Sequence, residues 1–247
     1  PYIPSADIAT LEPEVREHVL AAAAECAKRP LLFTLGSAEG FLDFDALLGA
    51  ADTRWQKPAD LPANDDMMLL YFTSGTTGMP KMAAHTWVYP IAQTVTAAYW
   101  HNVTDGDVHI AVADTGWAKA GWGKMYGQWI CGATLFVYDF DRFVAADMLA
   151  CLAKYRVTSF CAPPTVYRFM IKEDMARYDL SALRWANCAG EPLNPEVYEQ
   201  FLKATGVKIH EGFGQSETTP LLMTSKWMEP KAGSTGRPSP AYDIALV

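Results

Sequence analysis

From residue 67 onward, short apolar segments typical of β-strands alternate with longer segments typical of α-helices. The strand-like segments are 67–72, 108–112, 134–138, 158–161, 183–188 and 207–211. The helix-like segments are 86–99, 116–130, 145–154, 165–172 and 195–205. Alternating strands and helices favour parallel pairing, because each helix returns the chain to the same end of the sheet. We therefore expect an α/β fold with a mostly parallel sheet flanked by helices.

The first 65 residues give less distinct signals. A helix is expected at 13–28, where Pro13 suits the first turn and Pro30 stops the helix. A short strand is expected at 31–35. Residues 52–66 are polar and contain two prolines, which predicts a connecting loop.

Three unusual polar segments follow predicted strands, at 73–81, 189–192 and 211–217. In open α/β sheets, ligands bind beyond the carboxyl ends of the strands. The sequence therefore predicts a ligand site formed by these segments.

The first of these segments carries the groups that a polyphosphate needs. Residues 71–81 read YFTSGTTGMPK. Glycines let the backbone amides approach an anion, hydroxyls add donors, and Lys81 supplies a point charge. The spacing is not the common G-x-x-x-x-G-K-[ST] pattern. A solvated Ser/Thr/Gly turn is the alternative interpretation.

Several motifs, in order, resemble one known family. YFTSGTTGMPK resembles the phosphate-binding signature of the adenylate-forming superfamily, which includes acyl-CoA synthetases, peptide-synthetase adenylation domains and luciferases. The segments DTGW (114–117), AGEPL (189–193), EGFGQSE (211–217) and GSTGRP (233–238) resemble its later motifs. The resemblance covers most of the chain from about residue 67 and is greatest to short- and medium-chain acyl-CoA synthetases.

The resemblance implies that the protein uses ATP, Mg²⁺ and coenzyme A. One segment would hold the β- and γ-phosphates of ATP: Thr73, Ser74, Gly75, Thr76, Thr77, Gly78 and Lys81. Two later segments would line the nucleotide site: Gly190, Glu191, Pro192, Glu211, Gly212, Phe213, Gly214, Gln215 and Ser216.

Lys81 and Glu217 are the implied catalytic residues. Glu217 would help to bind Mg²⁺, since a carboxylate beside a polyphosphate requires a cation between them. A solvated or helix-start glutamate is the alternative. Phe213 stands where the family usually has tyrosine and keeps the face that stacks on adenine, although it could be a core aromatic residue. Ser216 replaces the usual threonine and keeps its hydroxyl.

The glycine-rich segment TGWAKAGWGKMYGQW (115–129) is expected to wall the acyl pocket through Trp117, Gly121 and Trp122. Each tryptophan could instead be a packing residue. His85 and His210 are expected to be structural, hydrogen-bonding histidines.

The implied reaction needs no general base. A carboxylate attacks the α-phosphorus of ATP to give an acyl-adenylate and pyrophosphate, and the thiol of coenzyme A then displaces AMP. The carboxylate is already ionised at neutral pH, so positioning and charge stabilisation suffice.

The resemblance also implies a C-terminal lid domain, which we expect to lie outside residues 1–247. We therefore expect 1–247 to be a partial adenylation domain, with 1–65 as its less distinct segment and 66–247 as the nucleotide- and acyl-binding core. Alone it is expected to be inactive. Two alternatives remain: an adenylating enzyme that transfers to a carrier protein, and a non-catalytic nucleotide-binding domain.

Composition restricts the partners and the location. The net charge is −8 and the pI is near 5.1, which disfavours nucleic acid and anionic membrane surfaces. No apolar run approaches a membrane span. The five cysteines show no CxxC spacing, which indicates reduced thiols. We expect a cytoplasmic protein that binds a small carboxylic acid, ATP and coenzyme A.

Overall fold

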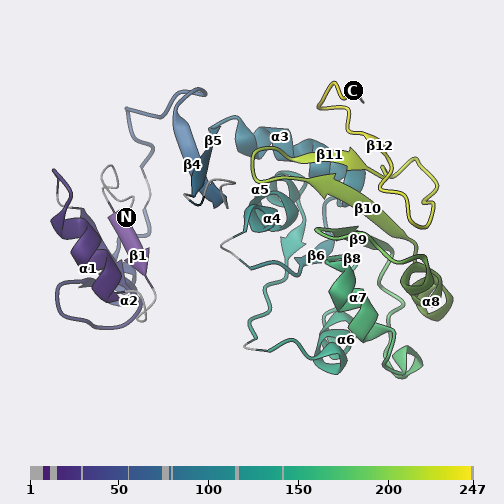
Figure 1. The fold of residues 1–247 in the computed structure, drawn as a ribbon. Coiled ribbons are helices and arrows are strands. Elements are labelled where there is room, and N and C mark those ends of the chain that lie inside the picture. The colour runs from purple at the N-terminus through teal and green to yellow at the C-terminus, as the bar shows by residue number, and fades with distance from the viewer. Residues whose placement is uncertain are drawn as a thin grey trace. The chain divides into compact units, whose positions relative to one another are not determined.

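The structure is a computed structural model (Figure 1) that describes residues 8–11, 16–28, 30–54, 56–73, 78, 80–114, 117–140 and 142–245. The chain divides into two compact units, residues 1–61 and 62–247.

The larger unit is built on a seven-stranded sheet with the order β12-β11-β10-β9-β8-β6-β7. Five strands run parallel: β6 (Val108–Ala111), β7 (Thr134–Leu135), β8 (Ser159–Ala162), β9 (Trp185–Ala189) and β10 (Ile209–Gly214). Two short strands add antiparallel to one edge: β11 (Pro220–Met223) and β12 (Arg237–Pro238). The predicted mostly parallel α/β sheet is confirmed.

The strand order reverses at β6. The chain passes from β6 to β7 on one side and then crosses to β8 on the other side of β6. Such a reversal leaves a crevice beyond the carboxyl ends of the two diverging strands, which is where ligands bind in open α/β sheets.

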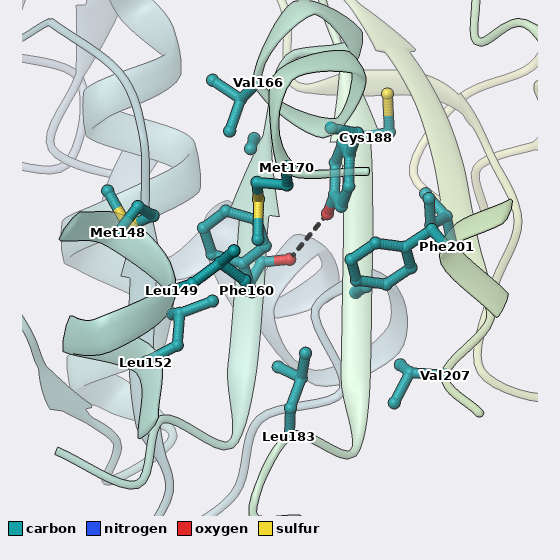
Figure 2. Packing of buried hydrophobic residues seen from close by; sticks show 14 of the residues in the cluster. Met148, Leu149, Leu152, Phe160, Val166, Met170, Leu183, Cys188, Phe201 and Val207 are labelled. Atoms are coloured by element: carbon teal, nitrogen blue, oxygen red, sulfur yellow. Dashed lines mark hydrogen bonds between the residues drawn. The ribbon is translucent and has the colours of Figure 1, made fainter. Parts of the chain in front are cut away.

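One face of this sheet is apolar and is covered by α6 (Ala145–Lys154), α7 (Pro164–Met170) and α8 (Pro195–Thr205). Figure 2 shows Phe160 of β8 between Leu149 and Leu152 of α6 and Phe201 of α8. All four side chains are fully or almost fully buried, so this cluster is the main hydrophobic core.

The other face is covered by shorter helical segments and is unusually polar. These segments are α3 (Tyr89–Val95), the π-helical turn η2 (Thr96–Trp100), α4 (Ala118–Ala120), the π-helical turn η3 (Gly121–Met125) and α5 (Tyr126–Ile130). His109 of β6 is buried there, with Nδ1 2.9 Å from Ser159 Oγ and Nε2 2.8 Å from the Gly123 carbonyl oxygen. Burial lowers the pKa of His109 to about 4, so its imidazole is neutral.

A separate antiparallel hairpin consists of β4 (Met67–Thr73) and β5 (Lys81–Thr86), with Thr73 opposite Lys81. The sequence predicted β4 but not β5, because the segment KMAAHT has few β-branched or aromatic residues and takes its strand conformation from pairing with β4. The helix predicted from Thr86 begins at Tyr89, with Pro90 in its first turn.

Other element boundaries also differ from the predictions. β7 ends at Leu135 rather than at Tyr138, and the sequence analysis predicted neither of the edge strands β11 and β12. The last parallel strand begins two residues later than expected and continues to Gly214, so the first half of the EGFGQSE motif belongs to a strand.

The smaller unit is a three-stranded parallel sheet of β1 (Ile8–Leu11), β2 (Leu31–Thr34) and β3 (Leu42–Asp43), with α1 (Arg16–Ala24) and α2 (Phe44–Ala50). Val19, Ala23 and Leu32 form its small core. The described part of α1 ends four residues before the predicted end at Lys28.

A network of hydrogen bonds around Asp107 holds the amino end of β6 in place. The carboxylate of Asp107 accepts hydrogen bonds from the amide and hydroxyl of Thr104, the hydroxyl of Thr158 and the guanidinium of Arg184. Burial acts to raise the pKa of Asp107, but Arg184 and the other donors outweigh it and hold the pKa below the ordinary value of 3.8. The ionised carboxylate therefore stabilises the folded chain.

Replacement of Phe160 by alanine is expected to lower the free energy of unfolding by about 3–5 kcal/mol, because it leaves a cavity in the main core. Phe169→Ala, at a residue on α7 that is 48% exposed, is the matched control and is expected to cost less than about 1 kcal/mol. Urea unfolding of both variants measures the difference. Equal losses would contradict the assignment of Phe160 to the core.

Asp107→Asn is expected to destabilise the chain at pH 7 by about 1–3 kcal/mol, because buried donors lose an ionised acceptor. The contribution of Asp107 is present above the ordinary pKa of its carboxyl and is lost as the pH falls through the lower pKa of the folded state. The gap between the two proteins should therefore narrow below pH 3.8 in urea unfolding measured from pH 7 to pH 3. A gap that stays constant over this range would be inconsistent with an ionised Asp107.

Candidate functional site

A pocket of about 330 Å³ opens beyond the carboxyl ends of β6, β8 and β9, where the strand order reverses. It brings together residues from four segments: Val112, Ala113, Asp114, Trp117, Lys119, Pro163, Ala189, Gly190 and Glu191. Two predicted groups thus meet in one pocket, Gly190 and Glu191 from the nucleotide set and Trp117 from the acyl set.

The backbone at Gly190 is accessible to a ligand. Its φ is +107°, a conformation that side chains rarely adopt, and a Cβ atom there would meet no atom within 4 Å. Just before it, the carbonyl oxygen of Ala189 accepts a hydrogen bond from Lys119 Nζ at 3.2 Å.

Lys119 was not singled out by the sequence analysis. It lies two residues after Trp117, within the segment expected to wall the acyl pocket, and that proximity was the available signal. Its ammonium group places a positive charge on the pocket wall.

The side chain of Glu191 is already engaged by α7. Its carboxylate accepts hydrogen bonds from the hydroxyl of Thr165 and forms an ion pair with Arg168 at 3.0 Å. These contacts tie the loop after β9 to the helix after β8. Pro192 follows on the surface, so the part of 190–192 left for a ligand is mainly backbone.

Glu211 is buried under this loop. Its Oε2 accepts a hydrogen bond from the amide of Leu193 at 3.3 Å, and burial raises the pKa of its carboxyl. Glu211 therefore supports the 189–193 loop from beneath.

The two glycines of EGFGQSE have packing reasons that the sequence could not reveal. A Cβ on Gly212 would lie 2.6 Å from the ring of Trp100, and a Cβ on Gly214 would lie 2.7 Å from the carbonyl oxygen of Thr219. Between them Phe213 is 46% exposed near the end of β10.

Residues 214–219 form a tight turn that presents Glu217. The amide of Gln215 donates to the hydroxyl of Thr218 at 3.2 Å. The carbonyl oxygen of Ser216 lies 2.7 Å from His85 Nε2. Glu217 is exposed and makes no ion pair with a described residue.

Part of the predicted phosphate-binding segment lies outside the described residues, namely Ser74, Gly75, Thr76 and Thr77. The remaining three are placed on the hairpin. Thr73 ends β4 and Lys81 begins β5, directly opposite each other, while Gly78 is exposed with φ +89°. Lys81 is exposed and has no ion pair with any residue in the described part of the chain.

The three predicted acyl-pocket residues lie in different environments. Trp117 is 72% exposed and lines the pocket, whereas Trp122 is 5% exposed and packs against Trp100 with ring centroids 5.8 Å apart. Gly121 is buried, and a Cβ there would lie 2.4 Å from the hydroxyl of Tyr71.

The two candidate histidines make backbone contacts. His210 is buried and stacks on Trp185, with the two ring centroids 3.8 Å apart. Its Nδ1 lies 3.2 Å from the carbonyl oxygen of Thr224. Burial lowers the pKa of His210 to about 4. His85 packs between the rings of Tyr71 and Tyr89.

A second pocket of about 570 Å³ lies on the β7 side of the end of β6 and includes Asp114, Lys124, Tyr138 and Phe140. None of the predicted site residues lines it. Within the described ranges, no three His, Cys, Asp or Glu side chains form a metal-binding cluster. None of the described helices is long and apolar enough to cross a bilayer.

Comparison with known proteins identifies relatives. The AMP-binding enzyme family matches residues 6–247. The chain is 42% identical over 185 residues to the mitochondrial acyl-coenzyme A synthetase ACSM3 of Mus musculus, covering 74% of this chain and 32% of that protein. It is 37% identical over 237 residues to the mitochondrial ACSM4 of Homo sapiens, covering 95% of this chain and 40% of that protein.

Among solved structures, an acyl-CoA synthetase of Brucella canis superposes with a TM-score of 0.83 at 25% identity. The match covers 98% of this chain and 45% of the other. The chain therefore spans less than half the length of these relatives.

These relatives contradict the expected cytoplasmic location, because the two acyl-coenzyme A synthetases named above are mitochondrial. The prediction failed because unpaired cysteines exclude an oxidising compartment but do not distinguish one reducing compartment from another. The fold, the order of the motifs and the extent of the family match agree: the chain belongs to the AMP-binding enzyme family.

Proposed function

We propose that the protein to which this chain belongs activates a carboxylic acid with ATP and transfers the acyl group to coenzyme A. The observation that carries the proposal is the pocket at the strand reversal, which joins the Gly190 loop to Trp117 and Lys119. A nucleotide on one wall and an acid on the other would have their reacting atoms in one crevice.

The described residues suit MgATP. Lys81 and Glu217 are exposed charges that no described residue neutralises, so each can engage a ligand. Lys81, Thr73 and Gly78 would hold the polyphosphate together with the four residues at 74–77. Glu217 would contribute to the shell of Mg²⁺, which neutralises the phosphate oxygens when it is bound.

The adenosine would lie between the strand ends. Phe213 is a partly exposed aromatic residue on which adenine would stack, and Gly190 offers backbone without an obstructing side chain. Glu191 and Glu211 act indirectly in this proposal, because their carboxylates hold the loop in place. Residues 66–247 would thus supply the nucleotide- and acyl-binding core.

The acid would enter beside Trp117. Val112, Ala113, Pro163 and Trp117 give the pocket an apolar wall, and its volume suits a short, medium, branched or aryl acid. Its carboxylate is ionised at neutral pH, so the protein needs to attract it rather than deprotonate it. The ammonium group of Lys119 supplies that attraction.

Lys81→Ala in the whole protein is expected to lower kcat/KM for MgATP by about 100-fold, because a charge aimed at the phosphates is lost. Glu217→Gln is expected to raise the Mg²⁺ concentration needed for half-maximal rate by about tenfold, the loss of one charge-assisted contact. ATP–pyrophosphate exchange with a panel of carboxylic acids measures both.

Lys203→Ala and Glu199→Gln, two exposed positions on α8, are the controls and should leave both quantities unchanged. Absence of acid-dependent exchange in the wild-type protein, with MgATP binding retained, would favour the non-catalytic nucleotide-binding alternative. Exchange without acyl-CoA formation would favour transfer to a carrier protein.

A further inference from the structure

The hairpin that carries Lys81 is not part of the seven-stranded sheet. β4 and β5 pair only with each other in the described part of the chain, whereas Glu217 follows β10 of the large sheet. No backbone ladder therefore sets the distance between the two groups proposed to act on MgATP.

We propose that His85 is the positioning residue that sets this distance. Its Nε2 lies 2.7 Å from the carbonyl oxygen of Ser216, the residue before Glu217. A carbonyl oxygen only accepts, so Nε2 carries the hydrogen and donates it. The bond joins residues 131 positions apart in the chain. This inference rests on the proposed function of Lys81 and Glu217.

The imidazole is held in place from both strands and from α3. Its ring centroid lies 4.3 Å from that of Tyr89 and 5.8 Å from that of Tyr71. Tyr89 is itself buried in the cluster that contains Trp100 and Trp122. The half-buried imidazole is therefore packed against a buried ring of the larger unit and is not a free surface side chain.

Strand β5 fixes the position of Lys81 relative to that of His85. Side chains alternate along a strand, so Lys81, Ala83 and His85 share one face of β5. The exposure pattern agrees, because Ala83 and His85 are half-buried while Met82 and Ala84 are exposed. Four residues of extended strand span about 13 Å, which is a rigid spacer between the His85 anchor and Lys81.

The acceptor is equally fixed. The hydroxyl of Tyr242 accepts a hydrogen bond from the amide of Thr219 at 2.9 Å, at the far end of the turn that contains Ser216. Gly214 closes the near end against Thr219. Both partners of the His85 bond are therefore held, and the bond fixes the hairpin against the turn.

A second contact of the hairpin is made by β4. Tyr71 of β4 lies against Gly121 through its hydroxyl. That contact attaches the hairpin to η3, next to the acyl segment, but it does not reach the turn that bears Glu217. Loss of His85 should therefore disturb the handling of MgATP and leave the handling of the acid intact.

The test uses the whole protein and ATP–pyrophosphate exchange. His85→Ala is expected to lower kcat/KM for MgATP by about tenfold, while KM for the acid stays within about twofold, because a misplaced phosphate contact costs rate without altering the acyl wall. His85→Gln keeps an N–H donor and should recover most of the loss. His18→Ala, at an exposed histidine of the smaller unit, is the matched control.

Amide hydrogen exchange supplies a second measurement that remains informative if His85→Ala is unstable. In His85→Gln and His85→Ala, exchange in the 214–218 turn should rise in proportion to the loss of kcat/KM for MgATP, while exchange in β9 stays unchanged.

Three results would overturn the proposal while the wild-type protein remains active: wild-type constants for His85→Ala, an equal rise in KM for both substrates, or no recovery in His85→Gln. A wild-type protein that shows no MgATP-dependent exchange with any acid would instead reject the proposed function itself.

Discussion

The larger unit depends on the hydrogen bonds that join one residue, Trp100, to two neighbouring strands of the large sheet. Its Nε1 donates to the carbonyl oxygens of His210 and Glu211, both at 3.1 Å, and its ring lies so close to Gly212 that a Cβ there would be 2.6 Å from it. Its own carbonyl oxygen accepts from the side chains of Trp185 and Asn187, both at 2.7 Å. Through its side chain and its backbone carbonyl, Trp100 therefore joins the helical layer to β10 and β9, the two strands whose ends carry the Glu217 turn and the Gly190 loop.

The two faces of the large sheet stabilise this arrangement in different ways. The face under α6, α7 and α8 is apolar and contributes burial, which is large but non-directional. The face under η2 and η3 is polar, and its contacts are directional. His109 contacts both Ser159 and Gly123, and Gln128 contacts His101. Burial holds the pKa of both histidines below the ordinary value, so the layer orients strands and helices without adding charge near the site.

Much of the fold was predictable because the parallel strands are mostly apolar and alternate with helices of ordinary length. What failed were the pairings that depend on a partner. β5 is a strand because β4 lies beside it, and β11 because β10 does. The sequence identified the segments that form the site, but not which side chains in them line the pocket and which are buried. Trp117 and Trp122 are five residues apart and alike in type, yet one lines a pocket and the other is buried. The motif glycines face Trp100 and Thr219, contacts that no local pattern could reveal.

The separation of the charged groups follows from the chemistry proposed for them. A reaction between a carboxylate and a polyphosphate needs opposite charges placed around two anions rather than a hydrogen-bonded set of acid and base. Such charges repel or neutralise one another when they share a single strand end, so they are carried by different elements: Lys81 by the hairpin, Glu217 by the turn after β10 and Lys119 by α4. Each then remains available to a ligand. As a consequence, the distances between these charged groups depend on hydrogen bonds between different elements. The bonds from His85 to Ser216 and from Lys119 to Ala189 are two such contacts.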